Sequence, residues 1–250
     1  MIRYSWRWFL KAMCQTRNNP EFKYVLENYK EICYNVKNAE AKYGIGENNV
    51  KIMAVTKNVD PKKVNYAISL GIKFLGENRV QEYMQKKDQY DKIADVHFIG
   101  HLQTNKVKYI INDVKLIQSV DSIKLANEID RLAKKNNKIM DILLEVNIGN
   151  ESSKSGVDAE KLFDLVYQIS ELNNVSVKGL MAIPPIGSGE EIFDRMNCLY
   201  NQVREKNISN VSMDILSMGM SGDYVTAIKH GANLVRIGTK LFGARNYMEV

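Results

Sequence analysis

The chain has 250 residues, of which 45% are hydrophobic and 26% charged, with only four prolines. This composition is that of a globular chain able to bury a large core, and it excludes disordered, collagen-like and low-complexity classes. No apolar run approaches the roughly 18 residues that a transmembrane helix needs, so we expect no membrane span. The net charge is +6, yet four of the 35 basic residues lie in the acid-free first 20 positions, which leaves 31 basic against 29 acidic residues elsewhere. We therefore expect no nucleic-acid partner.

Residues 1–20 form a basic amphipathic extension that we treat separately from the rest. Its apolar residues Ile2, Trp6, Phe9 or Leu10 and Met13 recur at helical spacing, and the stretch holds both tryptophans of the sequence. Three interpretations remain open: a targeting or membrane-surface segment, an extra helix docked on the body, or sequence upstream of a true start at Met13. The cysteines, at 14, 33 and 198, show no metal-ligand or redox spacing, which indicates a reducing compartment. We expect residues 21–250 to form one domain of a cytoplasmic protein.

From residue 22 onward the pattern alternates between helical and strand periods. A helical pattern over 22–43 ends at Gly44 and Gly46, which can close a helix in the left-handed conformation. Amphipathic segments of helical length, such as 121–135, follow at intervals and bring the predicted helices to eight. Between them, short apolar runs predict eight strands, at 52–57, 74–78, 96–100, 116–120, 142–148, 179–183, 213–218 and 234–238.

Strands that alternate with helices pair in parallel. Eight such units in about 200 residues predict a single closed (β/α)8 TIM-type barrel, an α/β fold for which about 250 residues is typical. A doubly wound open sheet is the alternative, but the count of eight and the absence of a composition shift favour the barrel. His97 lies on the third predicted strand and His101 directly follows it, and four residues of extended chain separate the two by about 13 Å. They cannot share a metal ion, and we expect no metal site.

Lys57 and Arg236 are the candidate reactive groups at the carboxyl ends of the strands, where parallel barrels place their sites. Met53, Val55 and Lys57 share one face of the first strand, so Lys57 points into the barrel mouth if Val55 fills the interior. Partial burial favours the neutral amine that Schiff-base chemistry needs, whereas a solvated strand-end lysine is the alternative. Arg236 must likewise enter the barrel mouth, unless a carboxylate pairs with it inside the barrel.

Two adjacent turns predict a phosphate site. The stretch Ser-Met-Gly-Met-Ser-Gly at 217–222 leaves the seventh strand and enters a helix, which places hydroxyls and free backbone N–H groups at a helix N-terminus. Gly238 and Thr239 do the same after the eighth strand, and barrels commonly hold phosphate in these two loops. A lysine nucleophile opposite a phosphate cradle, with an arginine between them, predicts a site for a phosphorylated aldehyde.

Seven sequence blocks resemble those of the pyridoxal phosphate homeostasis proteins and occur in the family order. The resemblance spans about residues 22–247 and departs from the family pattern in the first 20 residues and at Arg79, where many members have tyrosine. The blocks are Lys-Ile-Met-Ala-Val-Thr-Lys at 51–57, Gly-Glu-Asn-Arg-Val-Gln-Glu at 76–82, His-Phe-Ile-Gly-His-Leu-Gln-Thr-Asn-Lys at 97–106, Ser-Lys-Ser-Gly at 153–156, Leu-Ser-Met-Gly-Met-Ser at 216–221, Val-Arg-Ile-Gly-Thr at 235–239 and Phe-Gly-Ala-Arg-Asn-Tyr at 242–247.

The resemblance implies a barrel like the N-terminal domain of alanine racemase, with pyridoxal 5′-phosphate (PLP) bound as an internal aldimine on Lys57. Arg236 would face the pyridine nitrogen and discourage its protonation, which weakens the cofactor as an electron sink. Asn78 would line the ring pocket. The implied cofactor-binding residues, including those around the phosphate, are Lys57, Asn78, Ser217, Met220, Ser221, Arg236, Gly238 and Thr239.

The resemblance also implies a role in intracellular PLP homeostasis, by buffering or delivery, with little or no amino-acid turnover. Alanine racemases take one catalytic group from a tyrosine on a second domain, and this sequence ends soon after the barrel. We therefore expect a non-catalytic, monomeric protein that serves PLP-requiring apoenzymes. Lys154 is either a solvated loop residue or a group that assists cofactor exchange. The alternatives are a small PLP-dependent racemase or aldolase, and a lysine Schiff-base aldolase that acts on a sugar phosphate without cofactor.

Overall fold

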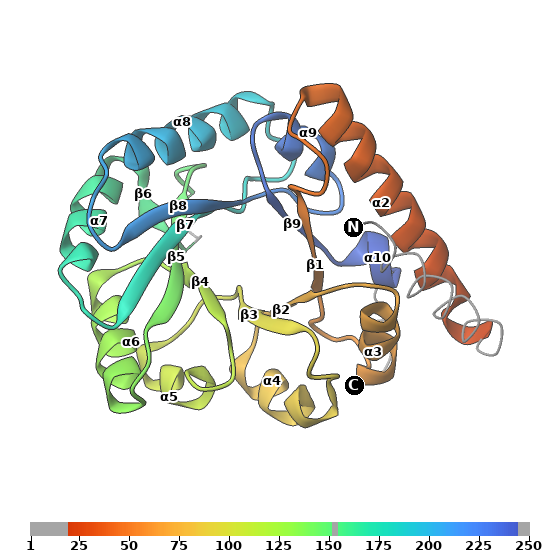
Figure 1. Ribbon diagram of the computed structural model, residues 1–250, viewed down its shortest axis with the longest axis horizontal. Coiled ribbons are helices and arrows are strands. Elements are labelled where there is room, and N and C mark those ends of the chain that lie inside the picture. The colour runs from red at the N-terminus through yellow and green to blue at the C-terminus, as the bar shows by residue number, and fades with distance from the viewer. Residues whose placement is uncertain (1–19, 152–154, 245–250) are drawn as a thin grey trace.

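The structure is a computed structural model that describes residues 20–151 and 155–244. Eight parallel strands form a ring in which each strand pairs with its neighbours and β4 pairs with β5 to close the barrel (Figure 1). The predicted (β/α)8 barrel is thereby confirmed, and the open-sheet alternative is wrong. A further two-residue strand, β6 (Val157–Asp158), pairs beside β5 and was not predicted. The barrel strands are β1 (Lys51–Val55), β2 (Phe74–Glu77), β3 (Asp95–Phe98), β4 (Leu116–Val120), β5 (Met140–Asn147), β7 (Val175–Met181), β8 (Val211–Ser217) and β9 (Leu234–Ile237).

Helices surround the barrel (Figure 1). The described residues contain nine α-helices, one more than predicted. Single turns of 3-10 helix cover Pro20–Phe22, Lys87–Gln89, Thr104–Lys106 and Ala159–Lys161. The α-helices are α2 (Lys23–Tyr43), α3 (Pro61–Ser69), α4 (Val80–Lys86), α5 (Val107–Ile110), α6 (Ile123–Lys135), α7 (Leu162–Ser170), α8 (Glu191–Glu205), α9 (Tyr224–Lys229) and α10 (Thr239–Phe242).

Local sequence accounts for where these helices begin and end. The predicted helix over 22–43 is α2, and it ends where Gly44 adopts a left-handed φ of 67° and donates its N–H to the Glu40 carbonyl. The predicted segment 121–135 becomes α6, which begins after Ser122 accepts a hydrogen bond from the Leu125 N–H. None of the helices among the described residues has the length and apolar character to cross a bilayer.

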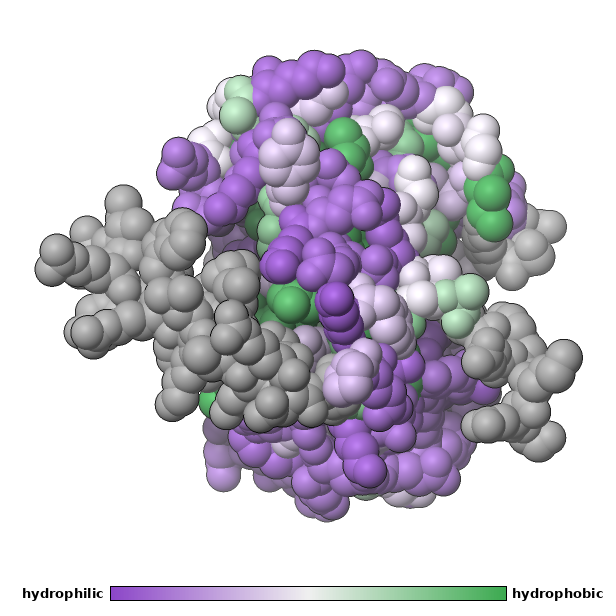
Figure 2. All heavy atoms as spheres, turned by 90° about the vertical axis from the view of Figure 1, so that its right-hand side faces the viewer, coloured by the Kyte–Doolittle hydropathy of each residue, from purple (hydrophilic) through white to green (hydrophobic). Residues whose placement is uncertain are grey.

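Helix α2 fastens the last two helices of the barrel. Asn28 Nδ2 donates to the Leu241 carbonyl at 3.1 Å, and Asn35 Nδ2 donates to the Tyr224 hydroxyl at 2.9 Å. Lys240 and Glu31 form an ion pair of 2.7 Å on the same contact. The side of the molecule that carries α2 is mostly hydrophilic over its coloured residues (Figure 2). The contacts of α2 therefore support α9 and α10, whose N-terminal ends follow the two predicted phosphate turns.

The apolar core has two layers. The larger layer lies between the sheet and the helices, and smaller clusters fill the barrel interior. Met53 and Val55 both belong to an interior cluster, so the alternation of strand β1 directs Lys57 toward the barrel mouth as predicted. The interior residues are Met53, Ile99, Leu234, Val55, Phe74 and Ile215 in one cluster, and Leu116, Leu143, Met181 and Ile215 in the other.

Candidate functional site

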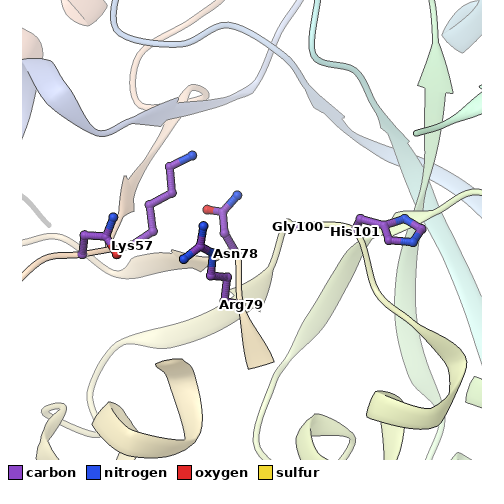
Figure 3. Close-up of a pocket in the computed structure, with 6 residues that line it drawn as sticks. Lys57, Asn78, Arg79, Gly100 and His101 are labelled. Carbon is purple, nitrogen blue, oxygen red and sulfur yellow. The ribbon is translucent and has the colours of Figure 1, made fainter. Parts of the chain in front are cut away.

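A cavity of about 280 Å³ opens at the carboxyl ends of β1, β2 and β3, and its volume lies just below the range usual for ligand pockets. Lys57 and Asn78 extend in a similar direction from neighbouring strand ends, and His101 lies farther from Lys57, beyond Gly100 (Figure 3). The residues that line the cavity are Lys57, Asn58, Asn78, Arg79, Gly100 and His101. The predicted candidates Lys57 and Asn78 thus share one cavity, while sequence reasoning missed Asn58, Gly100 and the role of His101 there.

The residue before Lys57 is held by a buried carboxyl group. Thr56 Oγ1 donates to Glu77 Oε1 at 2.6 Å, and Tyr90 OH donates to the same oxygen at 2.5 Å. The second oxygen of Glu77 is buried and has no hydrogen-bond partner. Burial raises the pKa of Glu77 above its ordinary value, while the hydrogen bonds from Thr56 and Tyr90 and the charge of Lys86 act in the opposite direction.

The residue after Lys57 is held by helix α4. Asn58 has a left-handed φ of 57°, which asparagine tolerates better than most residues. Its N–H donates to Glu82 Oε1 at 2.5 Å, and Lys86 Nζ bonds both that carboxylate, at 2.5 Å, and the Thr56 carbonyl, at 3.4 Å. The backbone on both sides of Lys57 is therefore fixed, so the side chain enters the cavity from a rigid turn.

Glu77→Gln is expected to make the fold more stable relative to the wild type as pH rises. A carboxyl group whose folded pKa lies above its unfolded value contributes most below the unfolded pKa and loses that contribution as pH rises through the folded pKa. The glutamine oxygen still accepts from Thr56 and Tyr90 and never ionises. The expected gain in melting temperature is larger at pH 7 than at pH 4. The control is Glu47→Gln, at an exposed position. Equal effects of Glu77→Gln at both pH values would show that burial does not raise the pKa of Glu77.

Gly100 and Asn78 meet at the floor of the cavity. A Cβ on Gly100 would lie 2.1 Å from the backbone oxygen of Asn78, so only glycine fits without moving β2. The side-chain oxygen of Asn78 is buried and has no hydrogen-bond partner. A buried polar atom without a hydrogen-bond partner costs folding free energy, unless a ligand or a water molecule supplies the missing partner. This atom fits a polar ligand held next to Lys57.

Arg236 lies inside the barrel on β9 and is 3% exposed. Its Nη1 donates to Ser217 Oγ at 2.7 Å, and its Nη2 donates to the Ala182 carbonyl at 2.8 Å. Among the described residues no carboxylate forms an ion pair with it, so the ion-pair alternative does not hold there. Burial lowers the pKa of Arg236 to about 10, opposed by Glu145 and Asp223, which leaves the guanidinium charged at neutral pH.

The two predicted phosphate turns lie together. Ser221 Oγ accepts a hydrogen bond from the Lys240 N–H at 3.1 Å, which joins the loop after β8 to the first turn of α10. An ideal Cβ on Gly238 would lie 3.5 Å from Val55 Cβ, so this turn borders the strand that leads to Lys57. Thr239 begins α10 directly after Gly238. The structure thus brings Ser221, Gly238 and Thr239 to one side of the barrel mouth.

Two further predicted phosphate residues, Met220 and Ser217, also have hydrogen-bond partners. The Met220 N–H donates to Asp223 Oδ1 at 2.6 Å. The Ser217 hydroxyl is fully buried, accepts from Arg236 and donates to Gln118 Oε1 at 2.7 Å. Ser217 thus supports Arg236, a use that local spacing did not indicate. Lys154 lies outside the described residues, although its neighbour Ser155 donates to the buried Glu145 at 2.9 Å.

Comparisons with known proteins agree with the sequence resemblance. A family model described as alanine racemase, N-terminal domain, matches residues 28–246. The pyridoxal phosphate homeostasis protein of Aquifex aeolicus is 42% identical over 229 residues, which cover 88% of this chain and 98% of that protein. The protein of the same name from Haemophilus influenzae is 36% identical over 80% of this chain and 87% of its own length.

Solved structures have the same architecture. An unknown protein from Bifidobacterium adolescentis matches with a TM-score of 0.85 and 29% identity, over 90% of this chain and 97% of that one. PipY of Synechococcus elongatus, solved with PLP bound, matches with a TM-score of 0.71 and 30% identity, over 83% of this chain and all of that one. Alanine racemase of Clostridium difficile matches with a TM-score of 0.69 and 16% identity, over 90% of this chain and 58% of that one. It shares the fold. The chain therefore belongs to the pyridoxal phosphate homeostasis protein family, whose barrel is that of the alanine racemase N-terminal domain.

Proposed function

We propose that this chain binds PLP in the cavity at the barrel mouth and takes part in PLP homeostasis. The observation that carries the proposal is the placement of Lys57 on a rigid turn, beside the orphaned oxygen of Asn78 and next to the strand that bears Arg236. The names of the relatives and the PLP in the PipY structure support the same ligand.

Each group of PLP has a suitable counterpart in the barrel mouth. Lys57 supplies the amine for the aldehyde, and Ser221 with the Gly238 and Thr239 turn supplies hydroxyl and backbone donors for the phosphate. Arg236 supplies a permanent positive charge for the pyridine side of the site. When bound, PLP supplies a reactive aldehyde and an electron-withdrawing ring. A charged guanidinium beside the pyridine nitrogen opposes protonation of that nitrogen, and so favours storage of PLP over carbanion chemistry.

We further propose that the protein has little or no amino-acid turnover and acts as a cytoplasmic monomer that supplies PLP-requiring apoenzymes. Racemisation needs an acid or base on each face of the substrate. Among the described residues that line the cavity, His101 carries the one imidazole, the side-chain type best suited to proton transfer at neutral pH. A PLP-dependent racemase or aldolase is the alternative function.

One experiment separates storage from catalysis. The PLP-loaded protein is incubated with the D and L forms of several amino acids, and the products are separated by chiral chromatography. In parallel, the loaded protein is mixed with a PLP-requiring apoenzyme whose recovered activity is followed. We expect no racemisation above background and restoration of the apoenzyme. Racemisation that disappears in Lys57→Ala would instead establish the enzyme alternative.

A further inference from the structure

Four buried polar side chains form a continuous hydrogen-bonded chain across the barrel interior. Arg236 on β9 bonds Ser217 on β8 at 2.7 Å, Ser217 bonds Gln118 on β4 at 2.7 Å, and Gln118 bonds His97 Nδ1 on β3 at 3.0 Å. Each of the four is at most 6% exposed. His97 also borders a second cavity, of about 320 Å³, at the amino-terminal end of the barrel. The chain therefore runs from the proposed PLP site to the opposite end of the barrel.

The four side chains can donate and accept along this hydrogen-bonded chain in one direction only, from Arg236 to His97. Arginine only donates, so the Ser217 oxygen accepts from Arg236 and the single proton of that hydroxyl is given to Gln118 Oε1. The amide oxygen of Gln118 is then used, and its nitrogen donates to His97. His97 Nδ1 must consequently be an unprotonated acceptor. Burial, with a smaller contribution from Lys51, lowers the pKa of His97 to about 3, so the neutral ring persists at physiological pH.

Loss of the acceptor at His97 would disturb every hydrogen bond of this buried series of side chains. If the amide of Gln118 turned over, its nitrogen would face Ser217, and the hydroxyl proton would lose its buried acceptor. Around this ring lie Lys51 from β1, Phe74 from β2 and, at the same cavity, the charged residues Asp95, Lys115, Asp141 and Lys178.

We propose that Gln118 and His97 are positioning residues that hold the Arg236 guanidinium in place against the pyridine side of bound PLP. The inference rests on the proposed function, because Arg236 matters there as a partner of the PLP ring. Neither residue is needed for the covalent link at Lys57. Their loss should therefore leave that link possible while it changes the environment of the ring.

The test compares two pairs of variants by PLP titration and absorption spectra. Gln118→Met removes the amide that links Ser217 to His97 but keeps a side chain of similar shape. Leu116→Met is its control on the same strand and in the barrel interior. His97→Leu removes the acceptor, whereas His97→Gln keeps an oxygen that can accept from Gln118. Each of Gln118→Met and His97→Leu leaves a buried polar neighbour without its partner, so we expect both variants to raise the PLP dissociation constant by roughly tenfold or more. Both should also shift the absorption maximum of bound PLP.

The outcomes are distinguishable. His97→Gln and Leu116→Met should keep the affinity and spectrum of the wild type, and a melting curve of each variant checks for a general loss of stability. Wild-type affinity and spectrum in both Gln118→Met and His97→Leu would overturn the inference while the proposed function stands. Equal losses of PLP affinity in His97→Gln and His97→Leu would also overturn the inference, because the acceptor retained in His97→Gln should preserve that affinity. Absence of PLP binding in the wild type itself would overturn the proposed function and this inference together.

Discussion

Lys57→Ala is expected to abolish covalent attachment of PLP and to lower its affinity by on the order of a hundredfold, or about 2.7 kcal/mol. The chain has 35 basic residues, but among the described residues Lys57 is the lysine that lines the cavity at the carboxyl ends of the barrel strands. Phosphate and ring contacts remain in the variant, so weak noncovalent binding should persist. The measurement is an equilibrium PLP titration that follows the visible band formed by a lysine-linked aldehyde.

The control for this variant is Lys62→Ala, which removes an exposed lysine near the start of α3. It should bind PLP as the wild type does. An unchanged visible band in Lys57→Ala would show that another amine carries the cofactor. Loss of the band in both variants would point to an indirect effect of charge on the fold, which a melting curve of each protein without PLP would reveal.

Gly100→Ala is expected to destabilise the fold by about 3 kcal/mol and to weaken PLP binding at the same time. The added Cβ would lie 2.1 Å from the Asn78 carbonyl oxygen and 2.8 Å from the adjacent Asn78 backbone carbons. These are backbone atoms of the residue that directly follows β2, so no side-chain rotation relieves the overlap. The end of β2 must move, and with it the Asn78 side chain that lines the cavity.

Urea unfolding of Gly100→Ala measures the first effect, and PLP titration measures the second. Gly222→Ala is the control for stability, because its Cβ would meet no atom within 4 Å and its backbone does not require glycine. Its unfolding free energy should change by less than about 0.5 kcal/mol. A Gly100→Ala protein as stable as the Gly222→Ala protein would show that β2 adapts and that Gly100 does not fix the cavity floor.

Much of the fold was predictable because the barrel strands are buried on both faces. All four residues of β9 are buried, for example, and three of them are apolar, so the strand shows in the sequence as a short apolar run. Strand alternation likewise predicted that Lys57 and Arg236 point inward, because Val55 and Leu234, two positions earlier, lie in the barrel interior. Strand β6 escaped prediction because two residues carry no period.

The supporting contacts of the site were not predictable from local pattern. Ser217 and Gln118 are 99 residues apart, and only closure of the barrel brings β8 and β4 across from each other. Spacing assigned Ser217 to the phosphate because it shares a turn with Ser221, whereas the folded chain commits its hydroxyl to Gln118 and Arg236. His101 was weighed as a metal ligand, although its position just after β3 could have marked it as a cavity residue.

The most direct test of the proposed site is to locate the bound cofactor on the chain. The protein is incubated with PLP, reduced with borohydride, digested and analysed by mass spectrometry, so that a lysine-linked PLP becomes a stable added mass on one peptide. The proposed site predicts this mass on the peptide that contains Lys57, together with loss of the visible band on reduction. Absence of any visible band and of any modified peptide, or modification confined to another lysine, would contradict it.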